Sequence, residues 1–516
     1  MTTTQRAGTP AATPTGTGRG VMPVIVVALA AVVSAISALN LAAPSIARDL
    51  DADQKQIAWV VDAYALSFAA LLLLAGAIGD RYGRRRALAA GLVVFVAGSG
   101  VAMATQSAGQ LIAVQAVLGA GAALVMPATL STITSTFPPE RRVRAVGTWA
   151  GVAGASAMLG LLATGLLLEA WSWRSVFAFN LAMGLVALAG TLAVVPESAD
   201  PDAPRLDLVG ALLSVAGLGL VVYSIIEAPT AGWESARTLA GLGLGLVVLA
   251  GFVAWELTRP DPLLDPRLFR LGGFSAGTLT ITVQFFGFFG FIFLVVQYLQ
   301  LVVGRSALVT ALSVLPMALV MMPSARGLAP HLAGRVGVRP VLAGGLLLVS
   351  AGFAVLSRLE ATSSYLPLLG GLVLLGAGMG LAMTPATSSI TDALPASKQG
   401  VGSAVNDLAR ELGAALGIAV LGSILQSVYR DELRLPPLPP AAAEQATSSV
   451  GAATHMGAAV AGPAQSAFVA GMQTALLWAS VTTAVLLVVV VVLGRVLPVA
   501  ARTVSSAAAG SASPRE

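Results

Sequence analysis

The feature that most constrains the fold is the repetition of long apolar runs along the chain. Runs of about 20 apolar residues recur, and each is long enough to cross the roughly 30 Å hydrocarbon core of a bilayer as a helix. Of the 516 residues, 56% are hydrophobic and only 10% are charged, so a soluble fold could not bury this apolar surface. Because lipid satisfies no backbone polar groups, the sequence predicts an all-α polytopic membrane protein.

The apolar runs predict about fourteen transmembrane helices. An even number places both ends of the chain on the same side of the membrane. The predicted spans are Val21–Ala47, Ile57–Ala77, Ala87–Thr105, Leu111–Thr132, Ala145–Leu168, Val176–Val195, Leu208–Ile226, Leu239–Trp255, Phe274–Val303, Ala307–Leu332, Val341–Leu356, Leu366–Ile390, Gly400–Val428 and Ala467–Leu493.

One charged stretch orients all of these spans. Gly76 to Arg86 reads G-A-I-G-D-R-Y-G-R-R-R and separates the second span from the third. Its acid and four arginines cannot lie in hydrocarbon, and arginine-rich loops most often face the cytoplasm. With this loop inside, cations on the cytoplasmic side outnumber those outside more than twofold. The sequence therefore predicts cytoplasmic N- and C-termini. The excess of Arg over Lys suggests a bacterial source and hence a bacterial plasma membrane.

An internal repeat suggests how the spans are grouped. Arg335, Gly337 and Arg339 follow the tenth span much as Arg81, Gly83 and Arg85 follow the second. Two related six-helix bundles with an inserted helix pair would explain this repeat. The expected organisation is a disordered cytoplasmic tail (1–20), an N-terminal bundle (21–200), an inserted transmembrane helix pair and linker (201–272), a C-terminal bundle (273–500) with a flexible outer loop (429–466), and a second cytoplasmic tail (501–516).

The charged loop also carries a family resemblance. Gly76, Asp80, Arg81, Gly83, Arg84 and Arg85 resemble the G-x-x-x-D-R-x-G-R-R motif of major facilitator superfamily transporters. The alternative is a solvated loop without a mechanical role. The resemblance implies that this loop acts as a conformational switch at the cytoplasmic ends of the helices.

Further segments are similar to those of the fourteen-helix drug:proton antiporters of this superfamily. They include Trp59–Tyr64, Asp207–Gly210, Pro262–Arg270 and Ala404–Gly413. The resemblance implies a secondary active transporter that exports hydrophobic or cationic small molecules, such as drugs, antibiotics and dyes, in exchange for protons by alternating access. It also implies that the protein is a monomer.

Ionisable residues within predicted spans are functional candidates by default. Asp62 lies near the start of the second span, where the resemblance implies a role with cationic substrates and protons. Trp59 and Tyr64 beside it would equally serve as interface anchors, with Asp62 near the lipid headgroups.

A second group of polar residues, Asn406, Asp407, Arg410 and Glu411, lies in the thirteenth span. Asp407 and Glu411 are four residues apart and share a helix face, and Arg410 can pair with Asp407. Burial favours the protonated form of a carboxyl group, whereas a neighbouring arginine favours the ionised form, so such a group can load and release a proton. The alternative is a neutralised, structural Arg–acid pair.

Three positions depart from the pattern of the antiporters. Ala35 stands where the first span usually carries an aspartate, and Gln115 stands where the fourth span carries an arginine. The glycine-rich motif of the fifth span retains Gly160 and Gly165 but has lost its proline. Arg410 is a candidate to replace the missing cation. A run of phenylalanines in the ninth span, Phe285 among them, is typical of packing surfaces and also of hydrophobic drug cavities.

Composition excludes several function classes. The chain has no Cys and only two His, which excludes a thiolate metal site and a histidine cluster. It has no G-x-x-x-x-G-K-[ST] phosphate-binding loop, so ATP does not drive it directly. The sequence thus predicts no enzyme activity and neither cofactor nor metal. The expected partners are a small-molecule substrate, protons and the lipid bilayer. Nucleic acid is not among them, because the net charge of +5 is spread over short loops.

Two alternatives to a multidrug exporter remain open. Ala35 and Gln115 replace an acid and an arginine that the multidrug exporters usually carry. Their absence favours a narrower exporter of one metabolite or a self-resistance pump. A non-transporting membrane sensor or lipid-handling protein belongs to another class, and the charged loop argues against it.

Overall fold

The computed structural model describes residues 18–52, 54–198, 206–394, 399–448, 450–454 and 456–496. These residues form helices joined by turns, and none of them lies in a β-strand. Thirteen helical segments in this part of the chain are long and apolar enough to cross a bilayer, and a shorter apolar stretch, Gly20–Ala35, lies within the first helix. The predicted all-α membrane fold with about fourteen spans is confirmed.

The first part of the chain folds into six long helices. The second packs on the fourth, the third packs on the fourth and sixth, and the first packs on the fifth and sixth. The six helices are α1 (Gly18–Asp49), α2 (Gln54–Tyr82), α3 (Arg84–Met103), α4 (Ala108–Thr136), α5 (Pro139–Ala170) and α6 (Arg174–Val194).

Two helices follow as a hairpin, α7 (Leu208–Ala231) and α8 (Ala236–Leu257). The Asp207 carboxylate caps the start of α7 and accepts a hydrogen bond from the Trp255 indole of α8 at 2.7 Å. The first helix of the pair also packs on α2. The second leaves large apolar side chains such as Val247 exposed, as expected for a surface that faces lipid.

The remaining helices form the second half of the molecule. Two π-helical turns, η2 and η3, interrupt it, and η3 follows Pro323, whose ring disrupts regular α-helical hydrogen bonding. The elements are η1 (Pro266–Arg270), α9 (Gly272–Gln297), η2 (Tyr298–Val302), α10 (Ala307–Pro323), η3 (Ser324–Leu328), α11 (Ala329–Val336), α12 (Val338–Leu356), α13 (Tyr365–Thr391), α14 (Gln399–Glu432), α15 (Pro440–Ser448), α16 (Val450–Thr454) and α17 (Ala458–Val496).

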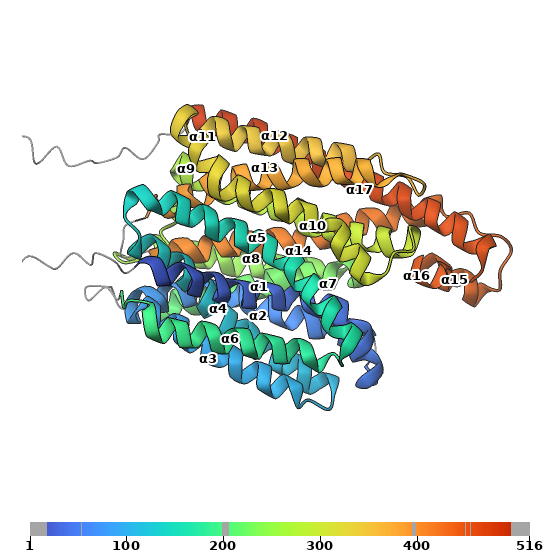
Figure 1. Cartoon of the computed structure of the whole chain (residues 1–516), viewed down its shortest axis with the longest axis horizontal. Coiled ribbons are helices and arrows are strands. Elements are labelled where there is room, and N and C mark those ends of the chain that lie inside the picture. Colours follow the sequence, from blue (N-terminus) through green and yellow to red (C-terminus); the bar gives the residue numbers. More distant parts are fainter. Residues whose placement is uncertain are drawn as a thin grey trace, which may run out of the picture.

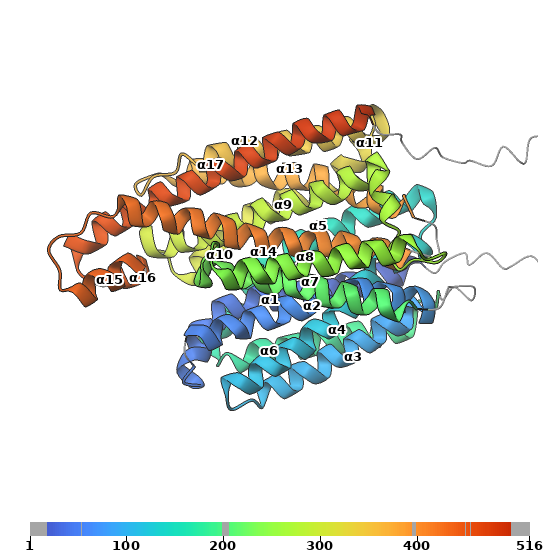
Figure 2. The same cartoon turned by 180° about the vertical axis from the view of Figure 1, so that it is seen from behind.

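The two sets of helices lie side by side, with α1 to α6 on one side and α9 to α14 with α17 on the other (Figure 1). They meet where α2 and α4 contact α14, and where α5 contacts α10 and α13. Figure 2 shows α7 and α8 across this seam, where α7 contacts both α2 and α14. The predicted domain boundaries near residues 200 and 272 stay predictions.

The helix pairs α2–α3 and α11–α12 are joined by similar turns. Gly83 has a φ of 109° and Gly337 a φ of 90°, a region that favours glycine. Matching turns of this kind agree with the internal repeat seen in the sequence. We call the end of the bundle at which α1 begins and α17 ends the terminal end, and the opposite end the distal end (Figure 1).

Within 429–466, where the sequence predicts a flexible outer loop, the structure contains two short helices, α15 and α16, at the distal end. The Tyr429 hydroxyl of α14 donates a hydrogen bond to the Ala446 carbonyl at 2.7 Å, and the Gln426 amide donates one to the Thr447 carbonyl at 3.2 Å. These contacts hold α15 against α14, and they cannot be read from the local Pro-, Ala- and Ser-rich composition.

Candidate functional site

The turn between α2 and α3 is tied to the end of α6. The φ of 109° at Gly83 favours glycine, and the Glu197 carboxylate lies directly beside this residue. The Arg85 backbone N–H donates to that carboxylate at 3.3 Å, and the Arg85 guanidinium donates to the Leu192 carbonyl at 2.6 Å. Arg81 lies over the ring of Tyr82, 5.6 Å from its centroid. The contacts of Arg85 therefore hold this turn against the end of α6.

Asp80 joins this turn to the other half of the molecule. Its carboxylate accepts hydrogen bonds from the Arg84 guanidinium at 3.0 Å and from the backbone N–H groups of Gly400 at 2.8 Å and Val401 at 3.1 Å. The first amides of a helix have no partner within the helix and favour a negative charge. Asp80, which is buried, thus caps the start of α14.

A close helix contact supports this cap. A Cβ atom at Gly76 would lie 2.5 Å from the Gly400 carbonyl oxygen, and one at Gly400 would lie 2.4 Å from the Gly76 carbonyl oxygen. Small residues at such crossings let transmembrane helices approach closely. The loop motif therefore connects α2 to α14 through both a charge and a backbone contact.

Deeper in α14, Asp407 and Arg410 form a buried pair. Asp407 is 0% exposed, and its Oδ1 atom lies 3.7 Å from the Arg410 Nη1 atom, too far for a hydrogen bond. The Thr387 hydroxyl donates to the Asn406 side-chain oxygen at 3.0 Å, and the Asn406 amide donates to Asp407 Oδ1 at 3.3 Å. Among the described residues, neither Asp407 Oδ2 nor Arg410 Nη1 has a hydrogen-bond partner.

Two aromatic rings contact the Arg410 guanidinium. Its central carbon lies 5.0 Å from the ring centroid of Trp149 on α5 and 4.5 Å from that of Phe285 on α9. Trp149 is fully buried, and its indole N–H donates to the Thr129 hydroxyl at 3.0 Å. Phe285 belongs to the aromatic run noted in the sequence. Trp149 was missed, because nothing in its local sequence shows which helix it faces.

Glu411 follows Arg410 on α14 and is partly buried. It interacts electrostatically with Arg410 and with Tyr64 of α2, whose hydroxyl donates to the Val32 carbonyl at 3.0 Å. The polar group of α14 therefore lies close to helices of the first half.

Gln115 and the two retained glycines of the fifth-span motif differ in how tightly they are packed. Gln115 on α4 is 1% exposed, and its amide nitrogen has no hydrogen-bond partner among the described residues. A Cβ atom at Gly160 of α5 would lie 2.7 Å from the Ser34 Cβ atom of α1, whereas one at Gly165 would meet only Leu41 at 3.7 Å. Of the two glycines, Gly160 alone is required by a close contact.

Asp62 lies on α2 toward the inserted helix pair. Trp59, one turn before it, stacks on Tyr223 of α7 with ring centroids 5.7 Å apart. Asp62 and Glu227 of α7 interact electrostatically, and Glu227 forms an ion pair with Arg237 of α8 at 3.6 Å. Glu227 and Arg237 are neighbours that the sequence interpretation did not include.

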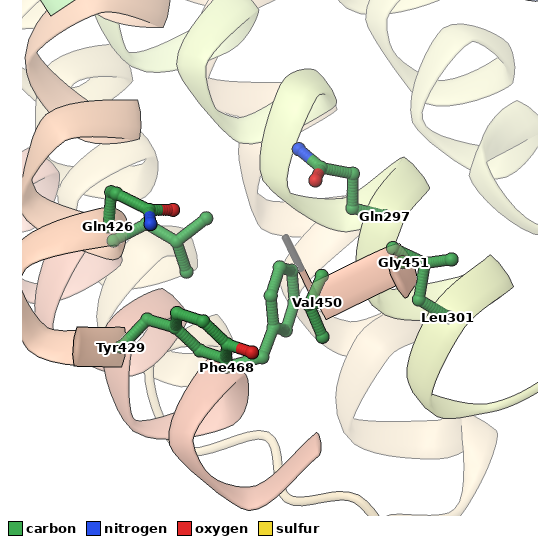
Figure 3. Close-up of a pocket in the computed structure, with 8 residues that line it drawn as sticks. Gln297, Leu301, Gln426, Tyr429, Val450, Gly451 and Phe468 are labelled. Carbon is green, nitrogen blue, oxygen red and sulfur yellow. The ribbon is translucent and has the colours of Figure 1, made fainter. Parts of the chain in front are cut away.

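A separate cavity of about 180 Å³ lies at the distal end, between α9, η2, α14, α16 and α17 (Figure 3). Polar groups of Gln297, Gln426 and Tyr429 line it, together with apolar side chains such as Phe468. None of the predicted site residues lines this cavity.

Comparison with known proteins agrees with this architecture. The model of the Major Facilitator Superfamily matches residues 25–418. The chain belongs to the Major Facilitator Superfamily. It is 34% identical to the multidrug resistance protein Stp of Mycobacterium tuberculosis over 75% of this chain and 72% of that protein. It is 34% identical to the multidrug efflux pump LfrA of Mycolicibacterium smegmatis (87% and 90%), and 32% identical to the tetracenomycin C resistance and export protein of Streptomyces glaucescens (84% and 81%).

Solved structures of the superfamily share the fold. The human organic anion transporter MFSD10 superimposes with a TM-score of 0.59 at 16% identity, over 90% of this chain and 99% of that one. The superfamily and these relatives consist of transporters, so the protein is a multi-pass membrane transporter and not an enzyme.

Proposed function

We propose that the protein exports hydrophobic or cationic small molecules in exchange for protons, by alternating access between its two halves. The relatives named above are resistance proteins and efflux pumps, which supports drug export. The observation that carries the exchange is Asp407, a fully buried carboxylate whose Oδ2 atom has no hydrogen-bond partner among the described residues. Such a group is suited to take up a proton or a substrate cation.

The Asp80 cap supports the alternating part of the proposal. It joins α2 to α14 at the terminal end, which we take to be cytoplasmic because of the arginines of the loop. Opening this end requires the cap to separate. On this basis both termini lie inside, and the described conformation is closed toward the cytoplasm at this contact. The resemblance to bacterial exporters supports a monomer in a bacterial plasma membrane.

The test uses the full chain in proteoliposomes with an imposed pH gradient, and a panel of cationic dyes and neutral antibiotics. We expect proton-driven uptake of several compounds, and its loss in a variant that combines Asp62→Asn, Asp407→Asn and Glu411→Gln. Glu169→Gln, at an exposed acid of α5, is the matched control and should transport normally. Undiminished proton-driven transport by the triple variant would overturn the proposal.

A narrow-specificity exporter is the second candidate. Gln115 favours it, because a buried amide in place of the expected arginine suits recognition of one hydrogen-bonding compound. The same panel distinguishes the narrow exporter from the multidrug exporter. Transport of a single compound that disappears in Gln115→Leu supports the narrow exporter, whereas transport of several compounds supports the multidrug exporter.

A further inference from the structure

The surroundings of Arg410 differ from those of an ordinary buried ion pair. Arginine and carboxylate usually meet through two short hydrogen bonds. Here the closest approach of Arg410 to Asp407 is 3.7 Å, and one nitrogen of the guanidinium makes no hydrogen bond among the described residues. The rings of Trp149 and Phe285 lie within 5.0 Å of the guanidinium carbon. The guanidinium therefore lies between two aromatic rings and is not hydrogen-bonded to the carboxylate.

The two rings come from different halves of the molecule. Trp149 belongs to α5 of the first half, where the bond to Thr129 fixes its indole, and Phe285 belongs to α9 of the second half. Aromatic faces attract organic cations strongly when water is excluded. Trp149 is 0% exposed and Phe285 is 3% exposed, so this condition is met.

We propose that Trp149, Phe285 and Asp407 form a binding site for a planar organic cation, and that the Arg410 guanidinium occupies this site when no substrate is bound. The guanidinium is itself a planar, delocalised cation. An arriving substrate would replace it on the rings and pair with Asp407. This inference rests on the proposed export function and names the class of substrate.

The charges of α14 allow such an exchange. When both Asp407 and Glu411 are ionised, they carry one more negative charge than Arg410 can balance, and one further cation or a proton can then neutralise it. A displaced Arg410 would remain close to Glu411, with which it already interacts electrostatically. A bound organic cation and a proton would then be alternative ways to balance the same pair of carboxylates.

The test measures equilibrium binding of ethidium, a planar organic cation, to the purified full-length protein by fluorescence. We expect Trp149→Leu to weaken binding by about tenfold, because tryptophan is the side chain whose ring attracts cations most strongly. Arg410→Gln should bind ethidium several-fold more tightly, because the internal competitor is gone. Trp171→Leu is the matched control, since Trp171 is 65% exposed, and its affinity should equal that of the wild type.

Two further variants keep the test decisive if Arg410→Gln fails to fold. Trp149→Phe retains a ring and should keep most of the affinity that Trp149→Leu loses. Arg410→Lys replaces the planar cation with a compact one and should bind ethidium more tightly than the wild type. Weaker binding by a folded Arg410→Gln variant, or equal affinities of Trp149→Leu and Trp171→Leu, would overturn the inference.

This binding experiment can succeed or fail independently of the transport test of the proposed function. Transport of neutral compounds without any ethidium binding would overturn this site and leave proton-driven export intact. Ethidium binding that responds to Trp149 and Arg410 as expected, in a protein that moves no compound against a pH gradient, would support the site and overturn the proposed function.

Discussion

Asp80 on α2 accepts a hydrogen bond from the backbone N–H of Gly400 at 2.8 Å, although the two residues are 320 positions apart in the chain. The bond places a carboxylate at the start of α14, where the helix amides need acceptors. Because α2 and α14 belong to different halves, we propose that this contact closes the terminal end, and changes at Asp80 should then be visible as changes in access to that end.

Asp80→Asn should loosen the contact between α2 and α14. The amide keeps one acceptor oxygen but loses the negative charge that pairs with Arg84 and with the amides of α14. The chain contains no cysteine, so a single Ser403→Cys reporter, at a position that is 0% exposed, has no labelling background. We expect maleimide labelling of this reporter to rise several-fold in the Asp80→Asn background.

Arg86→Gln provides the control for that experiment. Arg86 pairs with Glu197 at 3.6 Å, but its side chain is 77% exposed, and exposed ion pairs contribute little. Labelling of the reporter should stay at the wild-type rate. Equal rates in the Asp80→Asn and Arg86→Gln backgrounds would mean that Asp80 does not hold the terminal end closed.

Gly160→Ala should destabilise the contact between α5 and α1. The added methyl group would lie 2.7 Å from the Ser34 Cβ atom, so the helices must separate, and overpacking of this kind costs about 1–3 kcal/mol. Gly165→Ala, five residues along the same helix, meets only Leu41 at 3.7 Å and should be tolerated. The unfolding temperatures of the two purified variants test this, and an equal decrease in both would contradict it.

The spans and the loop motif could be predicted from the sequence because both are local patterns. Apolar length identifies a membrane helix, and the charges of residues 76–86 identify a surface turn. The ends of α5 and α14 were less predictable, because both helices continue past the apolar core into polar residues such as Arg141 and Asp431. A hydropathy pattern does not detect the parts of a helix that extend beyond the lipid.

The arrangement of the candidate site was less predictable than its composition. The acids of α14 stand out as charges in an apolar run, but the partners of Asp80 are two backbone amides that no side-chain pattern reveals. Trp149 looks like any large residue in an apolar helix until α5 and α14 are brought together. Contacts made across the two halves depend on tertiary packing, which a single sequence does not record.

The distal end should become less stable at acid pH through Asp49. Hydrogen bonds from the Trp173 indole N–H, at 2.9 Å, and from the Arg174 guanidinium lower the pKa of the Asp49 carboxyl below its usual value. A lowered pKa contributes stability that is present above the ordinary carboxyl pKa of about 4 and is lost as the pH falls through the folded-state value.

Asp49→Asn tests this dependence. Its unfolding temperature should lie below that of the wild type at pH 7, and the difference should shrink as the pH falls below about 4, because the wild-type carboxylate is then protonated as well. Glu169→Gln, at an exposed acid near the same end, controls for the loss of one charge. A difference in unfolding temperature that grows toward acid pH would contradict the predicted loss of the Asp49 contribution at low pH.

Tyr429→Phe should release α15 from α14 without unfolding the bundle. The change removes the hydroxyl that donates to the Ala446 carbonyl at 2.7 Å and leaves the ring in place beside the distal cavity. A hydrogen bond of this kind contributes about 0.5–1.5 kcal/mol, so amide hydrogen exchange in residues 440–448 should accelerate by about threefold to tenfold. Tyr298→Phe makes the same chemical change at the contact with the Glu360 carbonyl and should leave exchange in α15 unaltered. If α15 exchanges at the wild-type rate in Tyr429→Phe, this hydrogen bond does not determine its docking, and the bond between Gln426 and Thr447 remains as its principal attachment.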